Sequence, residues 1–258
     1  MAAPAPGKKL RVLLLHGYAM NQFSFRKRLM ALQKECKDIA EFVFANGPHH
    51  VQAFPNAANP DPPPPSPDDP LEKQPRAWWM SREEGYVGWE SAIQSLAQLS
   101  REQGPFDGVL GFSQGGTAAA VVAASIEHPE LLPENLEAIQ TTPLKFMISV
   151  SGFRPNDSAF DPLFSVPLQT PSLIIYGQND SIVSFERTQT LIDVCAHARV
   201  VRHPGEHYLP TPSPWRKFLT ACMKAWASGD DTWKTISPPV SDTSAQEATD
   251  DAQSWTRL

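Results

Sequence analysis

Cysteine is scarce in this chain: there are three in 258 residues, and they form no CxxC or CxxH spacing. An odd number of cysteines without such a framework excludes a disulfide-stapled scaffold and a zinc site built on cysteine. We expect Cys36, Cys195 and Cys222 to lie at helical positions as reduced core residues, as in a cytoplasmic or nuclear protein.

Long hydrophobic runs are also missing. No stretch reaches the ~18 consecutive apolar residues that mark a membrane-spanning helix. Residues 1–9 lack the apolar core of a secretory signal, and we expect them to form a flexible N-terminus ahead of the folded domain. The sequence therefore predicts no membrane span.

Positive charge is not in excess either. The formal net charge is −6, and most of it comes from residues 229–258, where acids outnumber bases. Nucleic-acid binding needs clustered Lys and Arg, so we expect none. The sequence contains no phosphate loop, haem motif or dinucleotide fingerprint, and we expect neither a cofactor nor a metal.

What the chain does contain is an alternation of short apolar runs with helical patterns. This alternation predicts an α/β fold in which a parallel sheet carries helices on both faces. We expect one domain over residues 10–228, with its last helix opening at Ser213 as N-cap and Pro214 as first residue. The six strand-like runs are 10–15, 41–45, 106–111, 145–150, 171–176 and 198–202.

Three segments depart from this alternation. Residues 55–75 hold nine prolines, which predicts either a stiff polyproline arm or local disorder bordering the functional site. Residues 151–168 leave room for only a minimal lid. Residues 229–258 are polar and acidic, and we expect a mostly disordered tail that Trp233 and Trp255 would pin to the body.

The most informative motif is Gly111-Phe112-Ser113-Gln114-Gly115, which fits G-x-S-x-G and follows a strand-like run. In a nucleophile elbow the serine sits on a strained strand-to-helix turn, and the glycines let neighbouring backbone approach closely. A helical run of small residues begins at Gly116 and completes the strand, turn and helix. Ser113 is therefore the candidate nucleophile.

A serine nucleophile needs an acid after a later strand. Asp180 follows the apolar run 171–176 in a turn that contains Gly177 and Asn179, two residues that tolerate tight geometry. We assign the acid to Asp180. The alternative is that Asp180 caps the helix that begins near Ser184.

The base is expected in the loop after the last strand, where His207 lies. His203 is the runner-up but still belongs to the strand, and His49 and His50 could line the site without performing chemistry. The chain order Ser113, Asp180, His207 is the order of nucleophile, acid and base in α/β-hydrolases. His207 would take the serine proton while Asp180 holds the imidazole in the correct tautomer.

An oxyanion hole requires two backbone N–H groups. One belongs to the residue after the nucleophile, Gln114, and the other is expected in the turn that follows the first strand. We assign the second to Tyr18, with Ala19 as the alternative. His16 would orient this turn or contact the substrate.

Several aromatic and aliphatic residues are candidates for contact with substrate. Trp78 and Trp79 either anchor the returning loop on the core or wall an acyl pocket. Phe153 and Leu209 are further candidates. We also expect a small apolar rim in the lid segment, formed by Phe153, Phe160, Leu163, Phe164 and Val166.

The chain resembles the FSH family of serine hydrolases, and most closely its ovarian-cancer-associated esterase branch. This resemblance implies an α/β-hydrolase fold, a cytoplasmic or nuclear location, esterase or thioesterase activity, and the roles given above to Ser113, Asp180 and His207. The proline-rich segment and the acidic tail depart from the family pattern. The resembling segments are 14–17, 46–49, 74–79, 104–115 and 150–153, Gly177 with Asp180, and Gly205 with His207.

These observations predict a serine esterase that cleaves carboxylic esters of medium to long acyl chains. An acyl thioesterase, including the type that releases polyketides, would use the same three residues. A non-catalytic interaction module that keeps the hydrolase shell is the alternative of a different class, because a fold alone does not establish turnover. The expected partner is a small acyl ester or thioester, and protein partners stay unassigned.

Overall fold

The core of the molecule is a parallel β-sheet. The computed structural model describes residues 8–55, 59–66 and 68–239. Its sheet has six strands in the order β10-β9-β8-β7-β1-β2, and every neighbouring pair is parallel. The predicted α/β fold class is confirmed. The strands are β1 (Leu10–Leu15), β2 (Ala40–Phe44), β7 (Gly108–Phe112), β8 (Phe146–Val150), β9 (Ser172–Gly177) and β10 (Ala198–His203).

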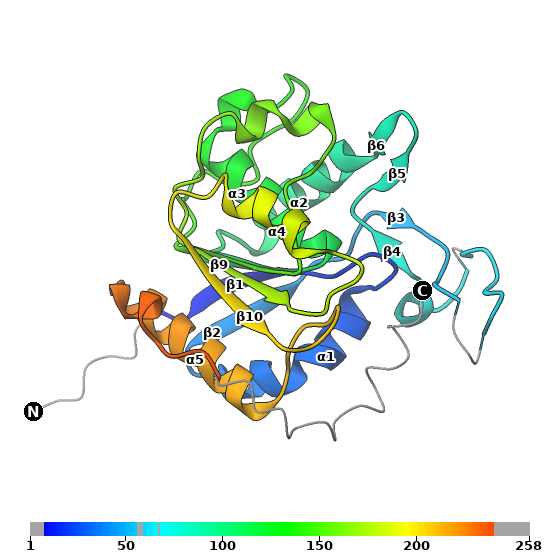
Figure 1. Ribbon diagram of the computed structural model, residues 1–258. Helices are drawn as coiled ribbons and strands as arrows, with labels where there is room; N and C mark the ends of the chain where they lie inside the picture. Colours follow the sequence, from blue (N-terminus) through cyan, green and yellow to red (C-terminus); the bar gives the residue numbers. More distant parts are fainter. Residues whose placement is uncertain (1–7, 56–58, 67, 240–258) are drawn as a thin grey trace, which may run out of the picture.

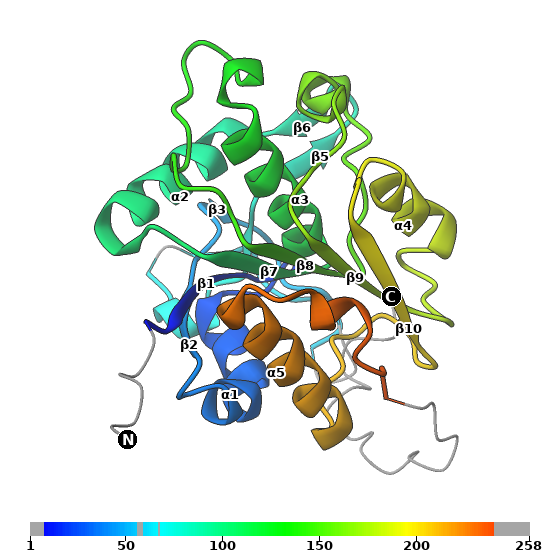
Figure 2. The same ribbon diagram turned by 90° about the vertical axis from the view of Figure 1, so that its left-hand side faces the viewer.

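Helices cover both faces of this sheet, as Figures 1 and 2 show: α1 and α5 lie on one face and α2, α3 and α4 on the other. A hydrophobic core lies on each face of the sheet, and alternate residues of β1 pack into one core or the other. Val12 and Leu14 pack with the α1 and α5 side, whereas Leu13 and Leu15 pack with the α2 and α3 side. The helices are α1 (Gln22–Glu35), α2 (Trp89–Gln103), α3 (Gln114–Glu127), α4 (Phe185–Ile192) and α5 (Ser213–Ser228).

Helix α3 lies close against the sheet because its residues are small. Every residue from Gly115 to Ile126 is buried. At Gly116 an added Cβ would meet the Ser149 hydroxyl at 2.9 Å and the Val150 carbonyl at 3.0 Å, so the helix backbone lies against β8. This close packing fixes the position of the residue that precedes the helix.

Short elements at the carboxyl side of the sheet complete the fold. Two antiparallel strand pairs join β3 (His49–His50) with β4 (Arg76–Ala77), and β5 (Met80–Arg82) with β6 (Gly85–Val87). Single 3-10 turns are η1 (Leu71–Lys73), η2 (Pro129–Leu131), η3 (Ser158–Phe160), η4 (Pro162–Phe164) and η5 (Asp231–Lys234). No helix among the described residues is long and apolar enough to cross a membrane.

The proline-rich segment is attached to the body at several points in its described part. Asn21, the N-cap of α1, donates its side-chain amide to the carbonyls of Glu72 and Gln74. The Gln52 side chain donates to the Pro62 carbonyl, and Pro62 is buried. The segment therefore runs beside the amino end of α1, and residues 71–73 form a 3-10 turn instead of continuing a polyproline arm.

The lid segment between β8 and β9 is as short as predicted, but it does not form the expected apolar rim. Phe160, Leu163 and Phe164 are buried and pack into the core beneath α2 and α3. Val166 is 42% exposed and Phe153 is half-buried. The aromatic residues of this segment thus anchor it, because burying rings stabilises the fold more than leaving them in water.

Trp233 pins the tail to the body as predicted, and the first part of the tail is more ordered than expected. Trp233 is 2% exposed and packs on Trp226 of α5 at a ring-centroid distance of 5.3 Å. The Arg199 guanidinium on β10 donates to the carbonyls of Trp233 and Ile236. Residues 229–239 are therefore a folded extension of the domain. Trp255 and the other residues of 240–258 lie outside the described residues, as do residues 1–7 of the expected N-terminal segment.

The cysteines and the last helix need small corrections. Cys222 lies in α5 and Cys36 caps α1, both buried, but Cys195 is half-buried and sits in an isolated bridge with Leu168 instead of a helix. Burial raises the pKa of the Cys195 and Cys222 thiols to about 11, which keeps them protonated. Helix α5 includes Ser213, so its N-cap is Pro212 and not Ser213.

Candidate active site

Ser113 lies in the turn between β7 and α3, and its backbone is strained. Its φ of 54° and ψ of −121° define a backbone conformation that residues with a side chain rarely adopt. The glycines of the motif permit this turn. An added Cβ on Gly111 would meet the Gly115 carbonyl oxygen at 1.9 Å, and one on Gly115 would meet the Leu15 carbonyl oxygen at 2.1 Å. Both distances are impossible for a real Cβ, so the turn requires glycine at both positions.

The structure brings Ser113, His207 and Asp180 into one hydrogen-bonded chain. The Nε2 atom of His207 lies 2.9 Å from the Ser113 hydroxyl, and its Nδ1 atom lies 2.7 Å from Asp180 Oδ2. The three residues follow β7, β10 and β9, whose carboxyl ends meet at one edge of the sheet. In this arrangement the imidazole can accept the serine proton while the carboxylate stabilises the resulting imidazolium.

The Asp180 carboxylate is held ionised by its surroundings. Burial would raise its pKa, but the hydrogen bond and charge of His207 act in the other direction, together with the backbone N–H groups of Val183 and Ile182, and the pKa is lowered. Helix α4 has Ser184 as its N-cap. Asp180 is therefore not the helix cap of the alternative interpretation, although one of its oxygens does order the loop that leads to the helix.

Two backbone N–H groups are the candidate oxyanion donors. Gln114 is the first residue of α3, where N–H groups have no acceptor within the helix. Tyr18 lies in the turn after β1, and its N–H donates to no acceptor among the described residues. Gly17 brings this turn against the elbow, since an added Cβ there would meet the Phe112 carbonyl oxygen at 3.4 Å. Ala19 has a φ of 58°, which gives the turn its tight shape.

His16 orients this turn and does not reach the surface. It is fully buried: its Nδ1 lies 2.8 Å from the Gly17 carbonyl and its Nε2 accepts the Gly47 N–H at 2.9 Å. These contacts require the neutral ring. Burial, assisted by the charge of Arg76, lowers its pKa to about 4, although the Gly17 hydrogen bond opposes the shift. The prediction that His16 contacts substrate is therefore contradicted.

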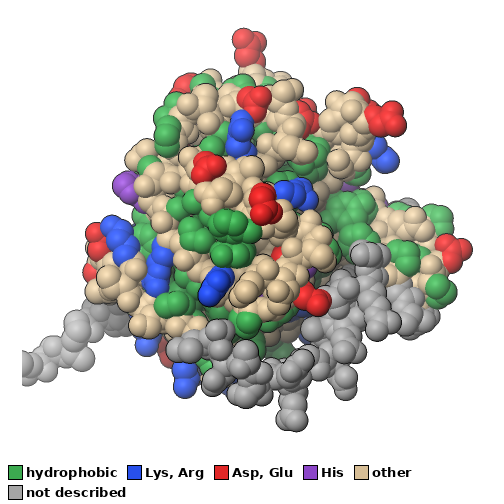
Figure 3. Space-filling view, in the orientation of Figure 1, with side chains coloured by type: hydrophobic (Ala, Val, Ile, Leu, Met, Phe, Trp, Pro, Cys, Tyr) green, Lys and Arg blue, Asp and Glu red, His purple; other side chains and the backbone are tan. Residues whose placement is uncertain are grey.

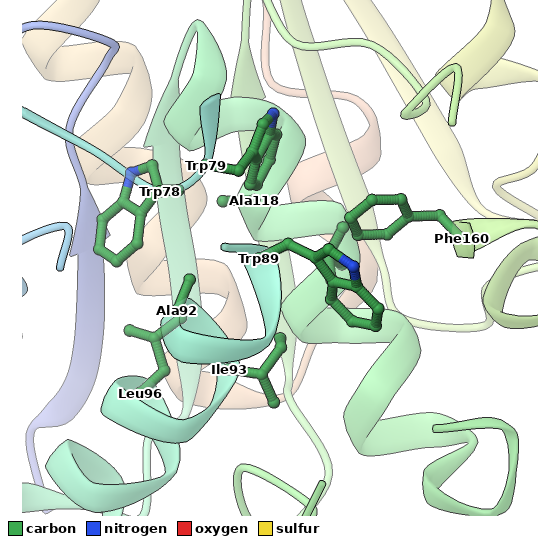
Figure 4. A pocket seen from close by; sticks show the side chains of 9 residues that line it. Trp78, Trp79, Trp89, Ala92, Ile93, Leu96, Ala118 and Phe160 are labelled. Atoms are coloured by element: carbon green, nitrogen blue, oxygen red, sulfur yellow. The ribbon is translucent and has the colours of Figure 1, made fainter. Parts of the chain in front are cut away.

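The two tryptophans anchor the loop on the core. Trp78 is fully buried and Trp79 is 4% exposed. Figure 4 shows both lining one cavity with Ala118 of α3 and Phe160, but its volume is only about 10 Å³, space for a single water. An acyl chain does not fit there. The burial of both rings favours the anchoring alternative over a wall of an acyl pocket.

The remaining candidate residues for substrate contact or for the base differ in how deeply they are buried. Leu209 is 2% exposed and packs into the core on the α1 and α5 side, which contradicts a role in substrate contact. Phe153 is half-buried, with the Arg187 guanidinium 3.9 Å from the centre of its ring. His203 is buried at the end of β10 and accepts the Gly205 N–H, so it does not compete with His207. His49 Nε2 lies 2.7 Å from the Gly88 carbonyl oxygen, and His50, the other residue of β3, pairs with Arg76 of β4.

Sequence reasoning missed the side chain of Gln114. Its Oε1 accepts the Trp78 N–H at 3.0 Å and its Nε2 donates to the Trp79 carbonyl at 2.8 Å. The motif singled out Gln114 only for its backbone N–H. Periodicity carries no information about a side chain that reaches a loop in another part of the chain.

Comparison with known proteins agrees with this geometry. The model of the family described as serine hydrolase (FSH1) matches residues 4–219. Esterase OVCA2 of Bos taurus is 34% identical over 222 residues, which cover 81% of this chain and 92% of that protein.

Solved structures resemble the chain in fold. Acyl-protein thioesterase 2 of Zea mays superposes with a TM-score of 0.56 at 18% identity, covering 88% of this chain and 97% of its own. Esterase PE8 superposes with a TM-score of 0.54 at 23% identity, covering 86% and 95%. These likenesses establish the α/β-hydrolase fold. Since the family model matches most of its length, the chain belongs to the FSH1 serine hydrolase family.

Proposed function

We propose that this protein is a serine esterase that cleaves carboxylic esters of medium to long acyl chains through an acyl-enzyme on Ser113. The observation that carries the proposal is the continuous hydrogen-bonded chain from the Ser113 hydroxyl through His207 to Asp180. Such a chain activates a serine that is otherwise a weak nucleophile. Membership of a serine hydrolase family supports the same role.

In the first half of the reaction, Ser113 Oγ attacks the ester carbonyl carbon and His207 Nε2 takes the hydroxyl proton. The carbonyl oxygen becomes an oxyanion, which would lie against the N–H groups of Gln114 and Tyr18. The C–O bond to the leaving group then breaks, and His207 returns the proton to the departing alcohol. In the second half a water molecule attacks the acyl-enzyme with the same proton transfers, which releases the acid and restores Ser113.

The acyl-chain preference rests on the surface around Ser113. The internal cavity beside Trp79 is too small, so a chain would have to lie along the exterior. Ile182 and Phe185 in the segment after Asp180 are 40% and 41% exposed, and Tyr18 in the turn after β1 packs on Phe54. Figure 3 shows hydrophobic patches around α4 with basic and acidic side chains interspersed. These groups support an uncharged, apolar acyl substrate.

The proposal extends to location. The three cysteines are free, and Cys36 and Cys222 are buried. Reduced thiols persist in cytosolic and nuclear proteins, where the redox buffer prevents disulfide formation. We therefore propose a cytoplasmic or nuclear enzyme.

The test is hydrolysis of p-nitrophenyl esters from acetyl to palmitoyl by the wild-type protein and by Ser113→Ala. Ser165→Ala is the matched control, because Ser165 is exposed in the lid segment and bonds only to its own turn. We expect a maximum at medium or long chains, near-complete loss in Ser113→Ala and wild-type rates in Ser165→Ala. Activity that falls steadily from acetyl onward would contradict the chain preference, and equal activity in Ser113→Ala would contradict the mechanism.

The thioester alternative is separated by the leaving group. An oxygen ester and a thioester of the same acyl chain differ in the atom that departs, while Ser113, His207 and Asp180 act identically on both. A higher kcat/KM for the oxygen ester is expected. The reverse order would assign the protein to the thioesterases with the same site.

A further inference from the structure

We propose that the side chain of Gln114 is a positioning residue that locks together the two backbone segments supplying the oxyanion N–H groups. Its backbone N–H belongs to the elbow, whereas its side chain reaches the loop that holds the opposite turn. The inference rests on the proposed function and names a device within that site.

The first link joins Gln114 to the Trp78–Trp79 segment. These two residues lie between β4 and β5, outside both strands, and both are buried. Buried backbone groups need partners, and here a side chain supplies them. Gln114 Oε1 accepts from Trp78 N at 3.0 Å, and its Nε2 donates to Trp79 O at 2.8 Å. The primary amide is suited to this because it can accept and donate at once.

The second link joins the same segment to the turn after β1. The indole Nε1–H of Trp78 donates to the His16 carbonyl at 2.8 Å, and the two rings lie 5.1 Å apart. That carbonyl directly precedes Gly17 and Tyr18. Two successive hydrogen bonds, through Trp78, thus connect the residue after Ser113 with His16, which lies two residues before the second oxyanion donor.

The two segments also touch directly. An added Cβ on Gly115 would meet the carbonyl oxygens of Leu15 and His16 at 2.1 and 2.5 Å. This contact resists approach of the segments but does not prevent their separation, because it is repulsive at shorter distance and weak at longer distance. The hydrogen bonds of Gln114 supply the restraint against separation. Oxyanion donors stabilise the transition state only when they already point at one place.

The chain contains a matched control at the other end of β7. Gln140 Oε1 accepts the Phe106 N–H at 2.8 Å, and its Nε2 donates to the carbonyl oxygens of Phe106 at 2.9 Å and Thr142 at 2.6 Å. Like Gln114, it bridges backbone groups with its amide. It lies at the amino end of β7, whereas Ser113 follows the carboxyl end.

The experiment compares Gln114→Met with Gln140→Met, since methionine keeps the length of the side chain and removes the amide. We expect Gln114→Met to lose on the order of 10²-fold in kcat, with KM almost unchanged, because misplacement by about 1 Å has effects of this size. Its affinity for an arylboronic acid, which forms a tetrahedral adduct with Ser113, should fall in parallel. Gln140→Met should lower Tm but keep kcat.

Two results would overturn the proposal: a wild-type kcat in Gln114→Met, or an equal loss of kcat in Gln140→Met. The second would show that the loss reflects general destabilisation. If the wild-type protein neither turns over esters or thioesters nor reacts with a fluorophosphonate, the proposed function itself fails and this inference fails with it. Wild-type turnover with an unchanged Gln114→Met overturns the inference alone.

The path through Trp78 is tested by Trp78→Phe, which keeps a packed ring and removes the indole N–H. Residues that act through one path give non-additive effects. The double variant Gln114→Met/Trp78→Phe should therefore have a kcat close to that of whichever single variant has the lower kcat. A kcat that equals the product of the two separate losses would exclude a shared path.

Discussion

His207 and Asp180 are joined by a hydrogen bond of 2.7 Å between Nδ1 and Oδ2, while the other oxygen of Asp180 accepts the backbone N–H groups of Ile182 and Val183. The carboxylate is thus fixed by its own loop before it orients the imidazole. With Nδ1 donating to Asp180, Nε2 is left to accept the Ser113 proton.

Asp180→Asn tests this orientation. The amide can present an N–H to Nδ1 and so favour the wrong tautomer, and we expect kcat to fall by about 10³–10⁴-fold, as in other serine triads. Asp193→Asn is the control, because Asp193 is exposed at the end of α4. Steady-state kinetics with a p-nitrophenyl ester provide the measurement. If kcat of Asp180→Asn stayed within about tenfold of the wild-type kcat, the assignment of Asp180 as the acid would be contradicted.

The elbow glycines give a prediction for stability. Gly115→Ala places a Cβ against backbone that cannot move away, and we expect a loss of more than about 3 kcal/mol in the free energy of unfolding, the upper end for overpacking. Gly229→Ala is matched in chemistry: its φ is 67° but an added Cβ meets nothing within 4 Å. It should lose only about 1 kcal/mol from the left-handed backbone. Equal losses in urea denaturation would show that the close approach at Gly115 is not the cause.

Two buried histidines predict how stability depends on pH. Burial lowers the pKa of His16 and of His203 to about 4. At His203 the nearby Asp180 carboxylate opposes this shift but does not cancel it. An unfolded histidine titrates near about 6.5, so between these values the unfolded chain binds more protons. The free energy of unfolding should therefore fall as pH drops from about 6.5 to 4, by at most about 1.4 kcal/mol per pH unit for each histidine.

His203→Asn removes one of these titrations and keeps an acceptor for the Gly205 N–H. Urea denaturation at several pH values should show a shallower dependence for this variant than for wild type. His197→Asn, at an exposed position, is the matched substitution control. An unchanged slope in His203→Asn would mean that His203 does not contribute to it.

Trp233 tests whether residues 229–239 belong to the domain. Its side chain is 2% exposed against α5, and Trp233→Ala should lower the free energy of unfolding by about 3–5 kcal/mol, as for other buried aromatics. Lys234→Ala, next to it and exposed, should change stability little. If both variants unfold at the wild-type urea concentration, this segment does not stabilise the body.

The sequence carried much of the fold because its signals were local. Apolar runs bounded by Gly and Pro mark strands, and the elbow motif between β7 and α3 places Ser113 on a known kind of turn. Asp180 and His207 could be found because each follows a strand in a fixed order. Their mutual distances could not, because they depend on how the strands pair.

The structure buries four side chains to which sequence position alone had assigned substrate contact: His16, Trp78, Trp79 and Leu209. Position near the carboxyl edge of the sheet does not tell whether a side chain points to solvent or into the core. His16 lies next to the oxyanion turn in sequence, yet its ring is buried between the carbonyl of Gly17 and the N–H of Gly47. The Gln114 amide bridge escaped prediction for the same reason, since its partners lie 35 and 36 residues away.

The most direct test of the account is reaction with a fluorophosphonate, followed by peptide mass spectrometry to locate the adduct. We expect one adduct per chain, on Ser113, and strongly slowed labelling in His207→Ala because the serine loses its base. An adduct on another residue, or no adduct on folded wild-type protein, would contradict the assignment of Ser113 as an activated nucleophile.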